Sequence, residues 1–196
     1  MNTILKSTKL TAALVAIVFG TGCAGVPKTS TVVQRISQPP AGKALVNFHR
    51  PSNYGGPRPI AIFSGDGKML VDLPGASLCQ RVCDPGESVF ITWADHVTVV
   101  KADLAADKIY DMMVDVSPGV WQINIYLTPL TKGDPRRAKL AEFEMREKRT
   151  LTINPASPHV VKYEANSRVR IEQIKRDFLS GEKSERVKVL AKDDCR

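Results

Sequence analysis

The residues of this sequence best suited to acid–base or metal chemistry are its three histidines, His49, His96 and His159. They lie far apart in the chain and share no ligand spacing of the His-Glu-x-x-His kind. A histidine on the polar face of a strand is more often solvated or hydrogen-bonded than catalytic, and we expect this of His49. The chain also contains no nucleophile-elbow pattern. The sequence therefore favours a protein that is not an enzyme, and it predicts neither a cofactor nor a bound metal.

Asp111 and Asp115 lie on one face of a predicted strand, and carboxylates are suitable calcium ligands. Acids on the solvent-facing side of an antiparallel strand are nevertheless ordinary, and this is the interpretation we prefer. A cleft that brought His49, His96, Asp95 and another acid together would instead indicate an enzyme.

Cys79 and Cys83 are candidates for a disulfide. In one regular strand their Cα atoms would lie about 13 Å apart, well beyond the limit of about 7 Å for a disulfide. A bridge therefore requires a tight loop at residues 80–82. Unpaired packing and metal binding are the alternatives, although Cys-x3-Cys alone lacks the four ligands of a zinc site. Because Cys195 makes the count of cysteines beyond Cys23 odd, at least one is unpaired or pairs with another molecule.

Residues 1–22 predict a signal peptide. Lys6 and Lys9 precede an apolar run over residues 10–19, which is too short for a membrane span of about 20 residues. The run leads into Gly-Thr-Gly-Cys, ending at Cys23. This ending resembles the lipobox of bacterial lipoproteins, in which the cysteine becomes the first residue of the mature chain and carries acyl groups.

Gly20 departs from that motif, which usually has an aliphatic residue there, and the alternative is a plain secretory signal. Ala24, and not Asp, follows Cys23, which by the same resemblance implies the outer membrane, facing the periplasm. We therefore expect the membrane as a partner, through a lipid on Cys23. Nucleic acid is a poor partner outside the cytoplasm, despite a sequence pI of about 9.4.

Residues 23–42 contain Pro39-Pro40 and no apolar period, and they predict a tether that could extend about 60 Å. Residues 43–130 then alternate apolar and polar side chains in seven or eight short runs, separated by Pro-Gly and Gly-rich turns. This pattern predicts a mainly β domain, an antiparallel β-sandwich. We expect the following core residues: Val46, Phe48, Val71, Ile91, Trp93, Val99, Met112, Val114, Trp121, Ile123 and Ile125.

Residues 131–196 predict a basic, mainly helical extension. Residues 132–196 hold seventeen Lys/Arg against eleven Asp/Glu, whereas residues 23–131 hold nine of each. Asp134-Pro135 predicts a helix start, with a strand around Phe143 as the alternative. Ser157-Pro158 predicts a second helix that stops near Gly181, and Ser184 to Leu190 suggests one or two further helical turns.

The second helix carries a basic group of residues that are candidates for contact with an anionic partner: Arg168, Arg170, Lys175 and Arg176. Anionic headgroups or an acidic envelope protein would suit the expected compartment. A solvated helix face is the alternative for these charges. The apolar row from Val160 to Phe178 must lie on a partner or on the sandwich itself, because isolated helices are marginal in water.

The order of motifs resembles bacterial lipoproteins of the domain of unknown function family 2846. The resemblance rests on Gly42-Lys43-Ala44, His49-Arg50-Pro51, Asp66-Gly67-Lys68, Pro85-Gly86 and Lys108-Ile109-Tyr110, and it covers residues 42 to about 128. Two positions depart from the family pattern: Glu87-Ser88 replaces a His-bearing position, and Asp107 replaces a glycine. The resemblance implies a fold and an address, but no activity and no functional residues.

Together these features predict an envelope lipoprotein anchored through Cys23 that serves as a non-catalytic binding or interaction module. The alternative is a periplasmic enzyme or ligand-binding protein whose site is built from loops.

Overall fold

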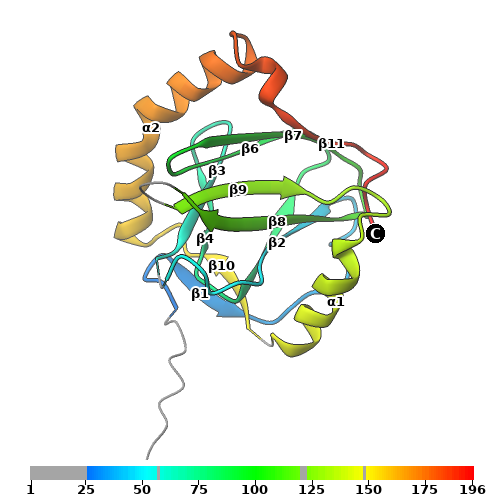
Figure 1. Cartoon of the computed structure of the whole chain (residues 1–196). Coiled ribbons are helices and arrows are strands. Elements are labelled where there is room, and N and C mark those ends of the chain that lie inside the picture. Colours follow the sequence, from blue (N-terminus) through cyan, green and yellow to red (C-terminus); the bar gives the residue numbers. More distant parts are fainter. Residues whose placement is uncertain (1–25, 57, 120–122, 148) are drawn as a thin grey trace, which may run out of the picture.

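A computed structural model describes residues 26–56, 58–119, 123–147 and 149–196. In these ranges two β-sheets pack against each other, and a helix lies on each side of the pair (Figure 1). The strands of the first sheet, in spatial order, are β1 (Ser30–Val33), β10 (Thr150–Ile153), β5 (Ser77–Cys83), β2 (Ala44–Arg50), β8 (Ile109–Pro118) and β9 (Ile123–Pro129). Those of the second are β11 (Lys188–Leu190), β7 (Val97–Leu104), β6 (Gly86–Trp93), β3 (Ile60–Ser64) and β4 (Met69–Leu73).

The expectation of a mainly β fold is confirmed, but that of purely antiparallel pairing is wrong. Strand β2 pairs in parallel with β8, β10 with β5, and β11 with β7. Parallel neighbours need a long connection between them, and the strands of the second sheet supply it between β2 and β8.

The predicted core is largely confirmed. Trp93 and Ile123 are only half-buried, and Trp121 lies outside the described residues. Every residue of β2 is buried, including Asn47 and His49 on its second face, because α1 (Arg136–Arg146) covers that face. The predicted core residues that are buried are Val46, Phe48, Val71, Ile91, Val99, Met112, Val114 and Ile125.

Two turns show why their residues occur where they do. Gly67 takes φ +85° in the hairpin between β3 and β4, and its N–H donates to the carbonyl of Ser64 at 3.0 Å. Asp107, at the position where the family 2846 pattern has glycine, takes φ +61° in the same left-handed region. Its carboxylate accepts a hydrogen bond from the N–H of Gly42 at 2.8 Å. Aspartate is one of the few residues besides glycine that tolerate this conformation, and here the hydrogen bond to Gly42 also holds its side chain.

The segment expected as a tether is instead part of the fold from Lys28 onward. Strand β1 pairs with β10, and the carbonyl of Lys28 accepts a hydrogen bond from Ser157 Oγ at 3.0 Å. Further along, the guanidinium of Arg35 donates to the carbonyls of Glu144 and Glu147, at 2.9 and 2.7 Å. These contacts fix residues 28–36 on the surface of the first sheet.

Residues 131–196 contribute one strand to each sheet and are no separate extension. The predicted helices are confirmed as α1 and α2 (Pro158–Leu179), with Pro158 in the first turn of α2. The helical turns predicted for residues 184–190 are wrong beyond a short 3-10 helix, η1 (Ser184–Arg186), because the chain then forms β11 beside β7.

Helix α2 docks on the outer face of the second sheet. Val160, Ile171, Ile174 and Phe178 are buried against a group that includes Phe63 and Ile91. The apolar row of the predicted second helix therefore lies on the sandwich. In the described part of the chain no helix is long and apolar enough to cross a membrane.

Candidate functional site

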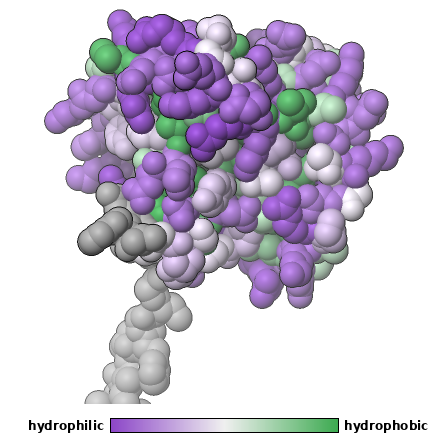
Figure 2. All heavy atoms as spheres, turned by 45° about the horizontal axis from the view of Figure 1, so that its top comes forward, coloured by the Kyte–Doolittle hydropathy of each residue, from purple (hydrophilic) through white to green (hydrophobic). Residues whose placement is uncertain are grey.

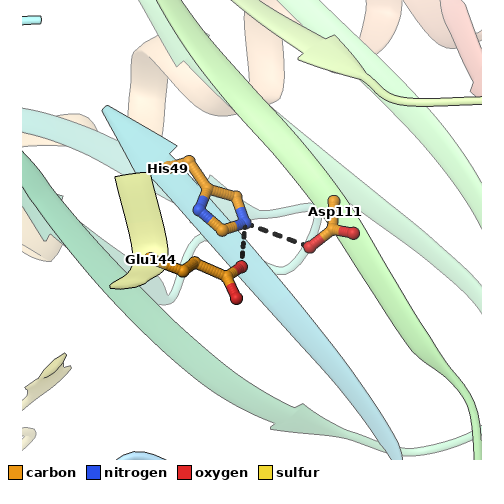
Figure 3. Close-up of side chains that lie close together, drawn as sticks. All are labelled: His49, Asp111 and Glu144. Carbon is orange, nitrogen blue, oxygen red and sulfur yellow. Dashed lines mark hydrogen bonds and ion pairs between the residues drawn. The ribbon is translucent and has the colours of Figure 1, made fainter. Parts of the chain in front are cut away.

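The best candidate for a functional site in the described residues is a cluster of one histidine and two acids between the first sheet and α1. His49 on β2 and Asp111 on β8 stand on neighbouring parallel strands, and Glu144 reaches them from α1. The Nε2 atom of His49 lies 3.0 Å from Asp111 Oδ1 and 3.5 Å from Glu144 Oε1, and it points toward both acids (Figure 3). His49 and Asp111 are buried, and Glu144 is half-buried.

Two arginines close the group. Arg137 of α1 donates from Nη1 to Asp111 Oδ2 at 2.8 Å. Arg196 donates from Nε to Asp111 Oδ2 at 2.7 Å and from Nη2 to Oδ1 at 2.6 Å, and it also binds both carboxylate oxygens of Glu144. Two carboxylates thus face two guanidinium groups, so the group can be electrically balanced.

The network continues through neutral side chains to the N-terminal part of the fold. Asn47 donates from Nδ2 to Asp111 Oδ1 at 3.1 Å, and Gln80 donates from Nε2 to Asn47 Oδ1 at 3.0 Å. Gln80 in turn exchanges two hydrogen bonds of 2.9 Å with the backbone of Ile36. The network therefore connects β2, β5, β8 and α1 with the N-terminal segment at Ile36 and with the C-terminal residue Arg196.

The electrostatic surroundings favour the charged forms of Asp111 and Arg196. Burial by itself would raise the pKa of Asp111, but hydrogen bonds from His49 and Arg196 outweigh burial and hold that pKa far below its usual range. Burial would likewise lower the pKa of Arg196, but its bonds to Asp111 and Glu144 raise that pKa above its ordinary value. Both groups therefore stay ionised at neutral pH.

The three acidic and imidazole groups could also serve as metal ligands, since their ligand atoms lie within 4.8 Å of one another. Arg196 already supplies the cation, however, because its Nη2 contacts both Asp111 Oδ1 and Glu144 Oε1. With five donor contacts on its two oxygens, Asp111 has little capacity left for a metal. The residues present therefore fit an ion network better than a metal centre.

A general-base role also fits poorly. The nitrogen of His49 that does not face the acids, Nδ1, is buried without a hydrogen-bond partner in the described structure, and the ring stands edge-on to Phe143. A base must lie within hydrogen-bond reach of its substrate. A pocket of ≈ 230 Å³ beside the network is lined by Asp111 and both arginines but not by His49.

The cluster of His49, His96, Asp95 and another acid that would have indicated an enzyme does not form. His96 and Asp95 are exposed in the turn between β6 and β7, where His96 stacks on Tyr126, and His159 is exposed at the start of α2. None of these residues joins His49. The predicted solvent-facing position is wrong for Asp111, which is 2% exposed, whereas Asp115 is half-buried beside Arg136.

The proposed disulfide is wrong, because Cys79 and Cys83 both lie in β5 and both are free. Burial raises the pKa of the Cys79 thiol to about 12 and that of Cys83 to about 11, so both remain protonated and unreactive. Cys195 is also free. Cys23 lies outside the described residues.

The predicted basic residues of α2 do lie at the surface. Arg168, Arg170 and Arg176 are exposed, and Lys175 is half-buried and paired with Glu172 at 3.1 Å. Figure 2 brings the upper side of Figure 1 forward, and hydrophilic residues cover most of the face shown. Arginine and lysine on α2 are therefore available to a partner.

A second hollow lies where α2 crosses the second sheet. It has a volume of ≈ 280 Å³ and its lining includes Arg58, Phe63, Trp93 and Tyr163. The ring of Phe63 stacks with Trp93 and with Tyr163, at centroid distances of 5.0 and 6.0 Å. The sequence did not indicate this pocket, because its residues come from four separate elements, β3, β6, β9 and α2.

Comparisons with known proteins found neither a matching protein-family model nor a relative among curated proteins. The resemblance to family 2846 stays a prediction, and the function has to be inferred from the geometry described above.

Proposed function

We propose that this protein is an envelope lipoprotein, anchored at the outer membrane by a lipid on Cys23, that acts as a non-catalytic binding module. The signal-like residues 1–22 and Gly22-Cys23 support the anchor. The closed His49–Asp111 network supports a structural role for the residues best suited to catalysis.

One observation carries the binding role: α2 exposes several cations without an ion pair in the described residues, on a helix that is docked on the second sheet. Arg168, Arg170 and Arg176 have no ion pair within the described part of the chain, while the apolar side of the helix is fixed on the second sheet. Cations that are held in place and not neutralised by neighbours attract an anionic partner over about a Debye length, ~8 Å at physiological salt. The partner class is therefore an anionic surface of the envelope.

The anchor is tested on the mature protein purified from the membranes of the producing bacterium. Mass spectrometry of its N-terminal peptide should show Cys23 as the first residue with acyl groups attached. The Cys23→Ser variant should leave the membrane fraction, whereas Cys195→Ser, a matched control, should stay in it. A cleaved chain with an unmodified Cys23 would contradict the proposal.

A second candidate function, ligand binding, is favoured by the aromatic pocket under α2. Its stacked rings and the exposed Arg58 suit a small aromatic or apolar anion. Naphthoate should quench tryptophan fluorescence saturably in the wild type. Ala61→Phe should abolish the quenching because Ala61 lines the pocket and a larger side chain fills it. Equal quenching of both proteins would rule the pocket out.

A further inference from the structure

The outward side of α2 is a single stripe. Lys162, Val169 and Arg176 are spaced by seven residues, and so they lie in line along the helix, opposite the buried Val160 and Ile171. Val169 is 80% exposed, the largest exposure among the exposed large hydrophobic residues of the described chain. Cations on this side can attract anionic lipid headgroups, and the exposed valine lies between two of them.

The acids of α2 do not neutralise this stripe. Each one is held by a lysine at the flank or beyond the helix, at 3.1 to 3.4 Å: Glu164 by Lys68, Glu172 by Lys175 and Asp177 by Lys183. Four cations have no such pair in the described residues: Lys162 and Arg176 on the stripe, and Arg168 and Arg170 on its two flanks. The stripe and its flanks are therefore positive in net terms.

The N-terminal segment enters the fold beside the first turn of α2. Ser157 Oγ donates to the carbonyl of Lys28 at 3.0 Å, and the N–H of Asn154 donates to the carbonyl of Thr29 at 2.8 Å. Lys28 itself is exposed. From Cys23 to Lys28 the chain advances five residues, which can span at most about 18 Å even when fully extended.

This span of about 18 Å is much shorter than the roughly 60 Å expected for a free tether, so an anchor at Cys23 would keep α2 near the membrane. A lipid on Cys23 holds the start of the helix within about 18 Å of the bilayer surface. Because about 18 Å is an upper limit, a bent segment lets the helix approach the bilayer to within a Debye length of about 8 Å, where a positive surface feels the potential of anionic lipids.

We infer that the outer stripe of α2 lies on the bilayer that holds Cys23, with Lys162, Arg168, Arg170 and Arg176 on anionic phospholipid headgroups and Val169 at the interface. This inference deepens the proposed function and rests on its lipid anchor. It identifies the anionic partner as the protein's own membrane, and the short span from the anchor is what favours lipid over an acidic protein.

The test compares lysine accessibility on membranes of two compositions. The full protein, purified from membranes, is reconstituted in phosphatidylcholine vesicles, or in vesicles with equal parts of phosphatidylcholine and phosphatidylglycerol, and treated with an amine-reactive reagent. Lys162 should label several-fold more slowly on the phosphatidylglycerol vesicles, and high salt should remove the difference. Lys139, exposed on α1 on the opposite side of the molecule, should label equally on both (Figure 1).

Two double variants with the same change in net charge sharpen the test. Lys162→Glu/Arg176→Glu, in a mature chain that also carries Cys23→Ser, should bind phosphatidylglycerol vesicles at least about tenfold more weakly than the Cys23→Ser chain alone. Lys139→Glu/Arg146→Glu on α1 should change binding little. Equal loss in both variants would overturn a specific role for α2.

A failure of the anchor and a failure of the helix contact give different results. If Cys23 carries lipid but Lys162 labels equally on both kinds of vesicle, the inference is wrong and the anchor stands. If Cys23 carries no lipid, the proposed anchor is wrong and the inference about the bilayer that holds Cys23 falls with it, even if the α2 variant alone loses vesicle binding. Protection of Lys162 in native envelopes but not on either vesicle would identify an acidic protein as the partner, and would overturn the inference for lipid.

Discussion

His49 and Arg50 are neighbours on β2, and their side chains point to opposite faces of the same sheet. Both are fully buried. His49 faces α1 and joins a network of ionised groups, Asp111, Glu144 and two arginines. Arg50 faces the loop that follows β2, and its guanidinium donates only to backbone carbonyls: those of Arg58 and Leu73 from Nη1, and of Tyr54 and Gly56 from Nη2.

The two sites compensate buried charge in different ways. On the His49 side, full charges of opposite sign balance one another. On the Arg50 side, dipoles of the backbone surround a single cation, and burial lowers the pKa of Arg50 without an acid to restore it. Charge pairs respond to pH and, where exposed, to salt, whereas carbonyl dipoles respond to neither. The stability of one side of the sheet should therefore depend on solution conditions, and that of the other should not.

The largest effect should come from Arg50→Met, which keeps an unbranched apolar stem but removes every donor. Four carbonyls, three in the loop and that of Leu73, would lose their hydrogen-bond donor. We therefore expect the free energy of unfolding to fall by about 3–5 kcal/mol. Urea unfolding at low and at high salt measures this loss. Because no ion pair is involved, the loss should be the same at both salt concentrations.

Arg50→Lys serves as the comparison for that change. Lysine keeps the charge but offers one ammonium group in place of a planar fork, so it should restore only part of the stability. A lysine variant as stable as the wild type would show that charge, and not the fork of donors, holds the loop.

The next largest effect should come from Asp111→Asn, which removes a charge but keeps the shape. Arg137 and Arg196 would lose their shared carboxylate, and we expect a loss of about 2–4 kcal/mol, less than for a fully buried pair because both arginines are partly exposed. Asp115→Asn on the same strand is the matched control. That acid meets Arg136 at 3.5 Å in a partly exposed position, so its loss should stay below about 1 kcal/mol.

Acid should weaken the His49 side specifically. The pKa of Asp111 is lower in the folded protein than in the unfolded chain, so its contribution to stability is complete above the ordinary aspartate pKa of about 4 and declines as the pH falls below it. Between pH 5 and pH 3, approximate limits chosen around that value, the wild type should lose more stability than Asp111→Asn does. Parallel pH curves for the two proteins would show that Asp111 is not the group responsible.

The smallest effect should come from Arg196→Ala. Asp111 would keep Arg137, His49 and Asn47, and Arg196 is partly exposed, so we expect a loss of about 1–2 kcal/mol that shrinks at high salt. Lys192→Ala removes the same charge from an exposed position of the same segment and should cost little. If the two variants behave alike, Arg196 contributes only net charge.

The strands could be predicted from the sequence because their signal is local. Alternation of apolar residues and Pro-Gly or Gly-rich turns mark β2 to β9, and Ser157-Pro158 marks the start of α2. The partners of the strands could not be predicted in the same way. Short strands such as β1, β10 and β11 hold three or four residues each, and their stability comes from neighbours that are distant in the chain.

The site was missed for a related physical reason. Asp111 and His49 follow the pattern of a solvent-facing strand side, and only the coverage by α1 makes that side an interior. Nothing in the spacing of Arg137, Glu144 and Arg196 points to Asp111. The sequence offered two signals that α1 covers this face of the sheet. One is the polar strand face itself, and the other is a charged helix with two apolar residues, Leu140 and Phe143, which are buried in the structure.

The arrangement of the edge strands bears on how the protein is made. β1 pairs with β10 and β7 with β11, and Arg196 completes the network around Asp111. Each sheet thus needs a strand that is synthesised late. Contacts between residues that are distant in the chain also make folding slow. The first sheet therefore cannot be completed before Ile153 has been synthesised, nor the second before Leu190.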